Sequence, residues 1–115
     1  MNELEYEKPA IEILNDVTIY CLKNGANEIY LEPTENNLII RYNINGTIYD
    51  YITLPESYKS QIISRVKILS GMQPTKKQDI QYGHIKSKLD DNFFELNVVN
   101  SYTEYGEKIT IVIEK

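Results

Sequence analysis

The chain is poor in the residues that most covalent, metal and catalytic sites need. Its 115 residues include one cysteine, one histidine and no tryptophan. One cysteine excludes an internal disulfide framework and a multi-cysteine zinc site, and Cys21 falls in an apolar helical pattern that places it in the core. The single histidine, His84, follows Gly83 at the start of a predicted strand. There we expect a surface residue rather than a metal ligand or a member of a Ser-His-Asp triad.

Long apolar runs and glycine-rich loops are missing as well. No apolar run approaches the roughly 18 residues that span a bilayer, and the acidic, polar segment 1–8 lacks the basic and apolar regions of a signal peptide. The five glycines are scattered and form no G-x-x-x-x-G-K-S/T phosphate loop. We therefore expect a cytoplasmic chain that is not inserted in a membrane. By itself it should be no enzyme and should bind no metal or other cofactor.

Arginine is scarce too: the chain has ten lysines but only two arginines, Arg41 and Arg65. The net charge of −5 argues against a nucleic-acid module, which usually carries a basic surface. Because arginine binds phosphate through a planar, bidentate group, these two residues are the candidates for phosphate contacts. Each has a structural alternative: Arg41 can pair with Asp50 across a hairpin, and Arg65 can lie along a helix surface.

Hydrophobic periodicity predicts two helices and six strands in a chain long enough for one soluble domain. The helices are expected at residues 9–24 and about 55–70, and the strands at 28–32, in a hairpin at 38–51, and at about 80–88, 93–100 and 107–114. The order α-β-β-β-α-β-β-β indicates an α+β fold, with a mostly antiparallel sheet of about six strands and two helices packed on one face. We expect residues 1–8 to be a flexible N-terminus and residues 9–115 to form a single domain.

The first hairpin can be paired residue by residue. If Asn45-Gly46 forms a two-residue type I′ turn, the facing pairs are Ile44 with Thr47, Tyr42 with Tyr49, Ile40 with Tyr51, Arg41 with Asp50 and Asn43 with Ile48. The face with Leu38, Ile40 and Tyr42 is predicted to meet the core. The face with Arg41 and Asn43 is more polar and is therefore available to a partner.

Five blocks of the sequence resemble signature blocks of the secretion ATPases, which power type II secretion, type IV pilus assembly and competence pseudopili. They are residues 26–33 (similar to A-S-D-I-H-x-E-P), 41–46 (R-x-R-x-D-G), 64–72 (S-R-x-K-x-x-x-G-x), 80–84 (P-Q-D-G-R) and 105–109 (G-E-K). The blocks occur in order, with family-like spacing, over about residues 8–113. Together they are more specific than any one block alone.

The resemblance implies the domain that immediately precedes the RecA-like ATPase domain in these hexameric motors, an α/β module often called PAS-like. In that family the domain moves as a rigid body, and arginines of its R-x-R-x-D-G and S-R-x-K blocks can reach the nucleotide, as an arginine finger does. By position these nucleotide-contacting residues would be Arg41 and Arg65. Asn43, Asp50 and Lys67 are then the candidates for a partner interface.

The resemblance also implies the partners of the chain. These are a RecA-like ATPase domain in the same or a neighbouring subunit and the inner-membrane platform proteins of a secretion or pilus system. ATP and Mg²⁺ would be bound by the parent motor, and the assembled machine would hold the domain at the inner face of the bacterial membrane.

Several positions depart from the family pattern and keep a second interpretation open. Asn43 replaces the second arginine of its block, His84 replaces the arginine of P-Q-D-G-R, and Asn97 falls where an arginine is common before the final strand. Such losses would weaken phosphate attraction. They favour a stand-alone PAS-like sensor or adaptor that binds a small ligand or a protein, whereas an independent enzyme would need a nucleophile-base pair or metal set that the sequence lacks.

Overall fold

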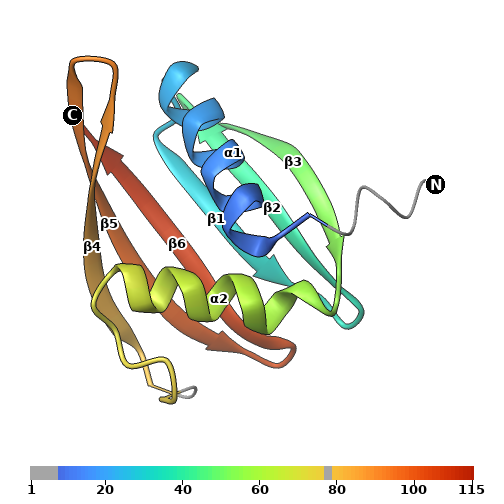
Figure 1. The fold of residues 1–115 in the computed structure, drawn as a ribbon. Helices are drawn as coiled ribbons and strands as arrows, with labels where there is room; N and C mark the ends of the chain where they lie inside the picture. Colours follow the sequence, from blue (N-terminus) through green and yellow to red (C-terminus); the bar gives the residue numbers. More distant parts are fainter. Residues whose placement is uncertain (1–7, 77–78) are drawn as a thin grey trace.

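Three strands precede the second helix and three follow it, and all six join in one antiparallel sheet. The computed structural model describes residues 8–76 and 79–115, and the strand order across its sheet is β3-β2-β1-β6-β5-β4 (Figure 1). The elements are α1 (Ala10–Lys23), β1 (Glu28–Pro33), β2 (Asn37–Ile44), β3 (Thr47–Pro55), α2 (Tyr58–Leu69), β4 (Gln81–Leu89), β5 (Asn92–Thr103) and β6 (Gly106–Glu114). Because β1 pairs with β6, strands from the two halves of the chain meet in the middle of the sheet.

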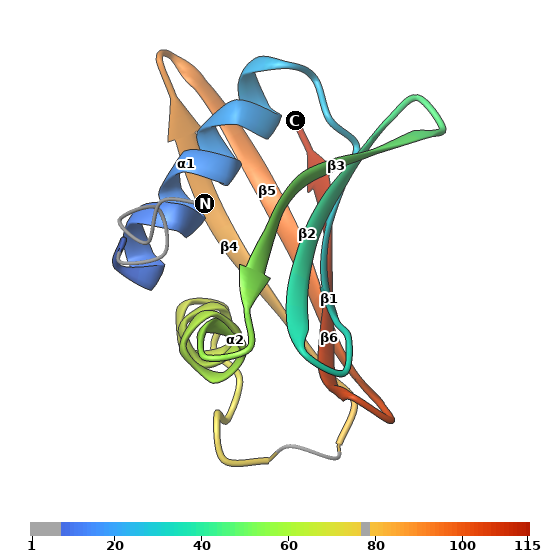
Figure 2. The same cartoon turned by 90° about the vertical axis from the view of Figure 1, so that its right-hand side faces the viewer.

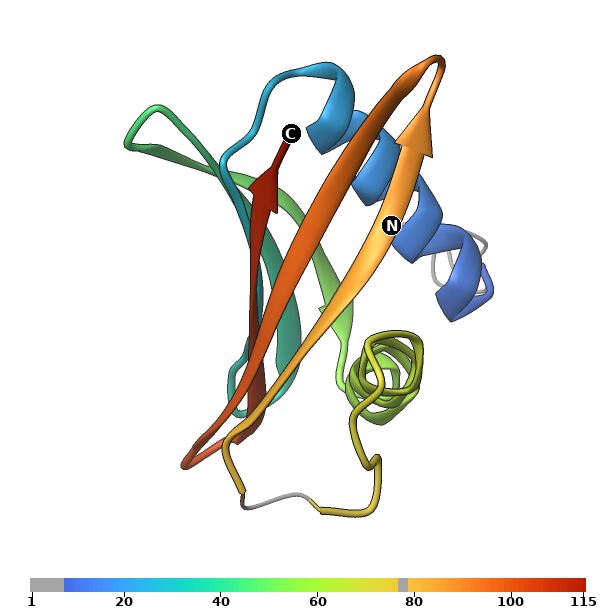
Figure 3. The ribbon, with the colours of Figure 1, turned by 90° about the vertical axis from the view of Figure 1, so that its left-hand side faces the viewer.

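Both helices cover one face of the sheet, and no other element of residues 8–76 and 79–115 covers the opposite face. The side views of Figures 2 and 3 place α1 and α2 on the same side of the strands. The helix α1 follows Pro9 and ends where Gly25 adopts a φ of 71°, a left-handed conformation that suits glycine. We call the side under the helices the covered face and the bare side the open face.

The covered face carries the hydrophobic core. Successive side chains of a strand point to opposite faces, so Ile29 and Leu31 of β1 are buried under the helices while Tyr30 lies on the open face. Cys21 of α1 is fully buried, as predicted, and burial raises the pKa of its thiol to about 12. The thiol is therefore a small core group.

The predicted fold class is confirmed, with the elements in the order α-β-β-β-α-β-β-β and both helices on one face of a six-stranded antiparallel sheet. The predicted hairpin turn is present as well. Asn45 and Gly46 have φ values of 50° and 94°, which are the positive values that a type I′ turn requires. This turn places Arg41 opposite Asp50 and Asn43 opposite Ile48, as expected.

One predicted pair of this hairpin is wrong. Ile40 lies opposite Ile52 instead of Tyr51, because the register shifts between Ile40 and Arg41 and leaves Tyr51 as an extra residue of β3. Both Tyr51 and Ile52 then pack against the core under the helices. A bulge of this kind follows no period of two, so the alternation of the sequence could not reveal it.

The start of the second helix also differs from the prediction. We expected the helix to begin near Pro55, but β3 continues to that residue, which pairs with Asn37, and α2 begins at Tyr58. The fully buried Leu54 explains the difference, because the chain stays in the sheet until this side chain has reached the core.

The expected flexible N-terminus, residues 1–8, lies outside the described residues except for Lys8. The carbonyl oxygen of Lys8 accepts a hydrogen bond from the Tyr58 hydroxyl at 2.7 Å. This bond attaches the residues that lead into α1 to the first turn of α2.

Candidate functional site

Arg41 lies on the open face, in β2, between two carboxylates. Its Nε donates to Asp50 Oδ1 of β3 at 2.7 Å, and its Nη1 donates to Glu32 Oε1 of β1 at 2.9 Å. The ammonium of Lys108, in β6, is 3.4 Å from the other oxygen of Glu32. Four neighbouring strands therefore build one group, which we call the Arg41 cluster: Arg41, Glu32, Asp50 and Lys108.

The Arg41 cluster is balanced in charge and partly exposed. It holds two cations and two carboxylates, and 35% of the Arg41 side chain is exposed. Hydrogen bonds to Asp50 and to Glu32 raise the pKa of the guanidinium, so its charge is permanent. A guanidinium has five N–H donors, and the two bonds to carboxylates leave three of them for another acceptor. An incoming anion would therefore have to share Arg41 with the carboxylates or displace them.

Asn43 lies on the same face, and both ends of its amide are engaged within the domain. Its Nδ2 donates to the Tyr30 hydroxyl at 3.1 Å, and its Oδ1 accepts the Gly46 backbone N–H at 2.8 Å. The Tyr30 hydroxyl donates in turn to Glu28, and burial together with this bond raises the pKa of Tyr30. Asn43 thus supports the hairpin turn. Asp50 differs, because 69% of its side chain is exposed and within reach of a partner.

Arg65 lies on the opposite side of the sheet from Arg41. It is an exposed residue of α2, which packs on the covered face, whereas Arg41 projects from the open face. Within residues 8–76 and 79–115, no carboxylate lies at ion-pair distance from Arg65. The structure does not bring the two arginines together, so one bound phosphate cannot contact both in this domain.

Lys67 is fully buried beneath α2, although we expected it at a partner interface. Its ammonium lies 2.6 Å from Glu107 Oε2 and donates to the backbone carbonyls of Lys76 at 2.9 Å and Pro74 at 3.4 Å. The same Glu107 oxygen accepts a bond from Asn100 Nδ2 at 2.8 Å. We call Lys67, Glu107 and Asn100 the Lys67 cluster. Because a buried charge needs a partner, this cluster holds the α2–β4 connection against β5 and β6.

Sequence reasoning missed Glu107 and Asn100. Lys67 and Glu107 stand in two of the blocks that resemble the secretion ATPases, residues 64–72 and 105–109, so their opposite charges were an available signal. Asn100 offered none, because it occupies a covered-face position of β5 where alternation predicts an apolar residue. Its Oδ1 is buried and has no hydrogen-bond partner within the described part of the chain.

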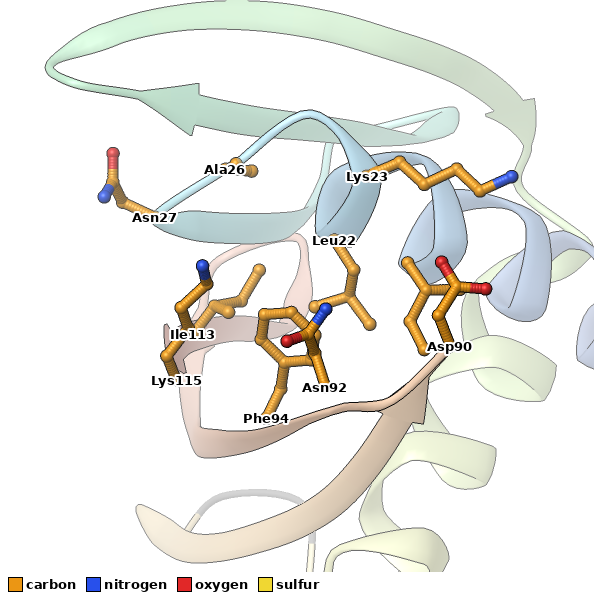
Figure 4. A pocket seen from close by; sticks show the side chains of 11 residues that line it. Leu22, Lys23, Ala26, Asn27, Asp90, Asn92, Phe94, Ile113 and Lys115 are labelled. Carbon is orange, nitrogen blue, oxygen red and sulfur yellow. The ribbon is translucent and has the colours of Figure 1, made fainter.

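A cleft of about 470 Å³ opens between the end of α1, the β4–β5 hairpin and the end of β6. Figure 4 shows the apolar side chains of Leu22 and Phe94 in the middle of this cleft, with Lys23, Asp90 and Lys115 at its margins. An apolar centre with charged margins suits a small amphipathic ligand. Arg41 is absent from the lining of the cleft, which therefore forms a separate feature of the fold.

Two further observations concern the described residues, 8–76 and 79–115. None of their helices is both long and apolar enough to cross a bilayer. Their histidine, cysteine and acidic side chains form no group of three that could hold a metal ion.

Comparison with known proteins relates this arrangement to a family. The family described as "Type II/IV secretion system protein" matches residues 3–114. Type II secretion system protein E of Xanthomonas campestris is 26% identical over 111 residues, which is 96% of this chain and 20% of that protein. The type IV pilus assembly ATPase PilB of Acinetobacter baylyi is 28% identical over 113 residues, 97% of this chain and 20% of the relative.

A third relative agrees with the first two. The type II secretion system ATPase E of Vibrio cholerae is 25% identical over 109 residues, 95% of this chain and 22% of that protein. The chain thus spans about a fifth of the length of these relatives, and it matches an N-terminal part of them. Since the family matches nearly the whole sequence, the chain belongs to the type II/IV secretion system protein family.

Proposed function

We propose that this chain is a non-catalytic domain of a type II secretion or type IV pilus assembly ATPase and docks on RecA-like ATPase domains through its open face. The observation that carries the proposal is the bare side of the sheet with the Arg41 cluster at its surface. A six-stranded sheet with one uncovered face has room for a second protein layer. The partner would be a RecA-like domain of the same or a neighbouring subunit in a hexameric motor.

In this proposal Arg41 supplies positive charge to the nucleotide site of the partner. ATP and Mg²⁺ are bound by the parent motor, and the three N–H donors that Arg41 keeps free can reach a phosphate oxygen at the interface. Asp50 and Glu32 restrain the guanidinium until docking provides a competing anion. Asn43 and Asp50 border this contact, whereas the enclosed Lys67 supports it only through the fold.

Arg65 serves a different contact in the same proposal. Because it lies on the other side of the sheet and has no ion-pair partner among the described residues, its charge is free for a second neighbour. In a ring of subunits, each domain has two flanks, so Arg41 and Arg65 would act at two different interfaces. The motor as a whole would be cytoplasmic, at the inner face of the bacterial membrane, and would meet the platform proteins of its secretion or pilus system there.

The test is ATP turnover by the intact motor that carries this domain. We expect Arg41→Ala to lower turnover by about tenfold or more, as the loss of a charge that stabilises the transition state does. Arg41→Lys should rescue it poorly, because lysine lacks the planar, bidentate group. Asp50→Asn removes one restraint on Arg41 and keeps its guanidinium, so turnover should fall less than in Arg41→Ala. Unchanged turnover in both Arg41→Ala and Arg65→Ala would refute the nucleotide contact.

The alternative function is a sensor or adaptor module that binds a small ligand. The cleft in Figure 4 is the observation that favours it, because its apolar centre and charged margins suit such a ligand. Titration of the purified chain with cyclic nucleotides would distinguish the two functions. Binding that is lost in Phe94→Ala, together with no affinity for a RecA-like ATPase domain, would replace the motor proposal with this one.

A further inference from the structure

The strand β4 is an edge of the sheet, and part of that edge has no partner within the described residues. It pairs with β5 on one side only. On its outer side the backbone N–H of His84 donates to the carbonyl of Ser70, at the end of α2, at 3.3 Å. Since N–H and C=O groups alternate in direction along an antiparallel strand, those of Lys86 and Lys88 also point outward. The edge is therefore closed near His84 and open at Lys86 and Lys88.

An apolar groove of about 250 Å³ runs beside the open part of this edge. Side chains of α1, the end of α2 and β4 line it, among them Ile19, Leu69, Ile85 and Leu89. Ile19 is 43% exposed and Leu69 is 49% exposed, so the groove presents apolar surface to the solvent. Figure 3 shows the edge of β4 beside α1, with α2 crossing below.

Basic side chains border the groove and the edge, and no acidic side chain lines the groove. Lys86 and Lys88 project from β4, and neither has a carboxylate at ion-pair distance within the described part of the chain. Arg65 lies one helical turn before Leu69 on the same side of α2. Lys88 lines the groove, with its ammonium 5.2 Å from the centre of the Phe93 ring, and Lys86 precedes it by two residues on the same side of β4. Cations without a carboxylate at ion-pair distance among the described residues are notable in a chain whose net charge is −5.

We propose that β4 accepts a seventh strand, donated by an extended segment of a partner protein in which apolar and acidic residues alternate. The outward backbone groups of Lys86 and Lys88 would pair with that segment, as in other cases of strand addition. Its alternate side chains point to opposite faces, so one set enters the groove beside Ile85 and Leu89 while the other set meets the two lysines.

The lysines select the occupant of this edge. If two copies of the chain paired through β4, Lys86 and Lys88 of one copy would face those of the other, and like charges opposite each other are unfavourable. An acidic strand turns the same charges into an attraction. The groove lies on the covered side of β4, whereas Lys86 and Lys88 project from its other side, opposite Glu95 and Phe93 of β5. The strand β4 is at the far edge of the sheet from β3, and the Arg41 cluster contains no residue of β4 or β5.

The test uses the purified chain and a blocked synthetic peptide of alternating valine and glutamate, followed by amide chemical shifts in NMR. We expect shifts confined to β4 and the groove residues, with binding that weakens as salt rises. The double variant Lys86→Glu/Lys88→Glu should bind at least about tenfold more weakly, since two attractions become repulsions. A valine-lysine peptide of the same length should not bind at this edge.

A second variant tests the strand pairing separately from the charge. Lys86→Pro removes one outward N–H that the fold does not use, so the sheet should remain folded while binding of the peptide is lost. Lys86→Gln is the matched control, because it loses the same charge and keeps the N–H. Absence of localised shifts with the valine-glutamate peptide would overturn the proposal. Unchanged binding in Lys86→Pro, or peptide-free self-association through β4, would overturn it too.

Discussion

The two faces of the sheet each hold a cation between oxygen acceptors, and the two groups differ in their exposure to solvent. The Lys67 cluster is enclosed between α2 and the sheet, with the ammonium 2.6 Å from Glu107. The Arg41 cluster lies on the open face, with the guanidinium at 2.7 Å and 2.9 Å from two carboxylates. The donor–acceptor distances of the two clusters are similar, but only the Arg41 cluster is exposed to solvent. Burial, rather than geometry, decides how much each ion pair contributes to the stability of the fold.

The difference follows from the energy of an unpaired charge. Removing one member of a buried pair leaves the other without water or a counter-charge, which is costly. Removing one member of an exposed pair returns the other to solvent at little cost. The following changes test this contrast, from the largest expected effect to the smallest.

Lys67→Met should destabilise the domain most, by about 3–5 kcal/mol, because it leaves the enclosed Glu107 without its counter-charge and removes one donor from each of the Lys76 and Pro74 carbonyls. Urea unfolding followed by far-UV circular dichroism measures the change. The double variant Lys67→Met/Glu107→Leu should cost less than the sum of the two single variants. If Lys67→Met lowered the free energy of unfolding by less than about 1 kcal/mol, the Lys67–Glu107 pair would contribute no more than a surface ion pair does, which would contradict this prediction.

Gly83→Ala should have the next largest effect, because β4 approaches the end of α2 very closely at that position. A Cβ atom at Gly83 would lie 2.2 Å from the Ser70 carbonyl oxygen, so the helix end or the strand must move. We expect a loss of about 1–3 kcal/mol, typical of overpacking. Ser87→Ala, on the same strand and face, is the control and should change the unfolding midpoint little.

Alkaline pH should lower the stability of the domain through ionisation of Tyr42, which lies on the covered face. A hydrogen bond with the Tyr20 hydroxyl, followed by burial, raises the pKa of Tyr42 to about 12, whereas an unfolded tyrosine ionises near about 10. The folded state thus favours the protonated form. Protonated Tyr42 therefore contributes to the stability of the fold below pH 10, and this contribution is lost as the pH rises from 10 towards 12. Tyrosinate absorbance, compared between the native chain and Tyr42→Phe, measures this ionisation; a Tyr42 signal near pH 10 would contradict it.

Arg41→Ala should have the smallest effect on stability, about 1 kcal/mol or less, because its partners on the open face become solvated. Thermal unfolding measures this. Arg41→Lys serves as the control for the loss of charge. If Arg41→Ala unfolded the domain, the Arg41 cluster would be structural, and its effect on ATP turnover could no longer be assigned to the nucleotide contact.

Local sequence patterns were sufficient to predict most of the fold. The Asn45-Gly46 turn fixed the register of its hairpin, so the contact between Arg41 and Asp50 followed from pairing alone. The sequence did not predict the bulge at Tyr51, because an inserted residue interrupts the alternation of side chains along the strand. The sequence also did not predict where the second helix begins. Burial of Leu54 keeps Pro55 in the sheet, although proline locally favours the first turn of a helix.

The candidate site was less predictable than the fold. The sequence placed Arg41 on the more polar face of its hairpin and Arg65 on a helix surface, and the structure has both there. It gave no means to see that the two arginines lie on opposite sides of the sheet. Lys67 was expected at a partner interface. Its burial depends on Glu107, which is 40 residues away in the sequence, and no local pattern reports a partner at that distance.

By itself, the sequence determined the family, the element order and the side of β2 that meets the core. These properties depend on the alternation of apolar residues and on turns made by neighbouring residues. Only the tertiary structure decided which charges are enclosed and which are exposed, and that the outer backbone groups of Lys86 and Lys88 lack partners among the described residues. Those properties depend on what packs against each residue from distant parts of the chain, because solvent access, and not residue type, sets the energy of a charge or an unpaired backbone group.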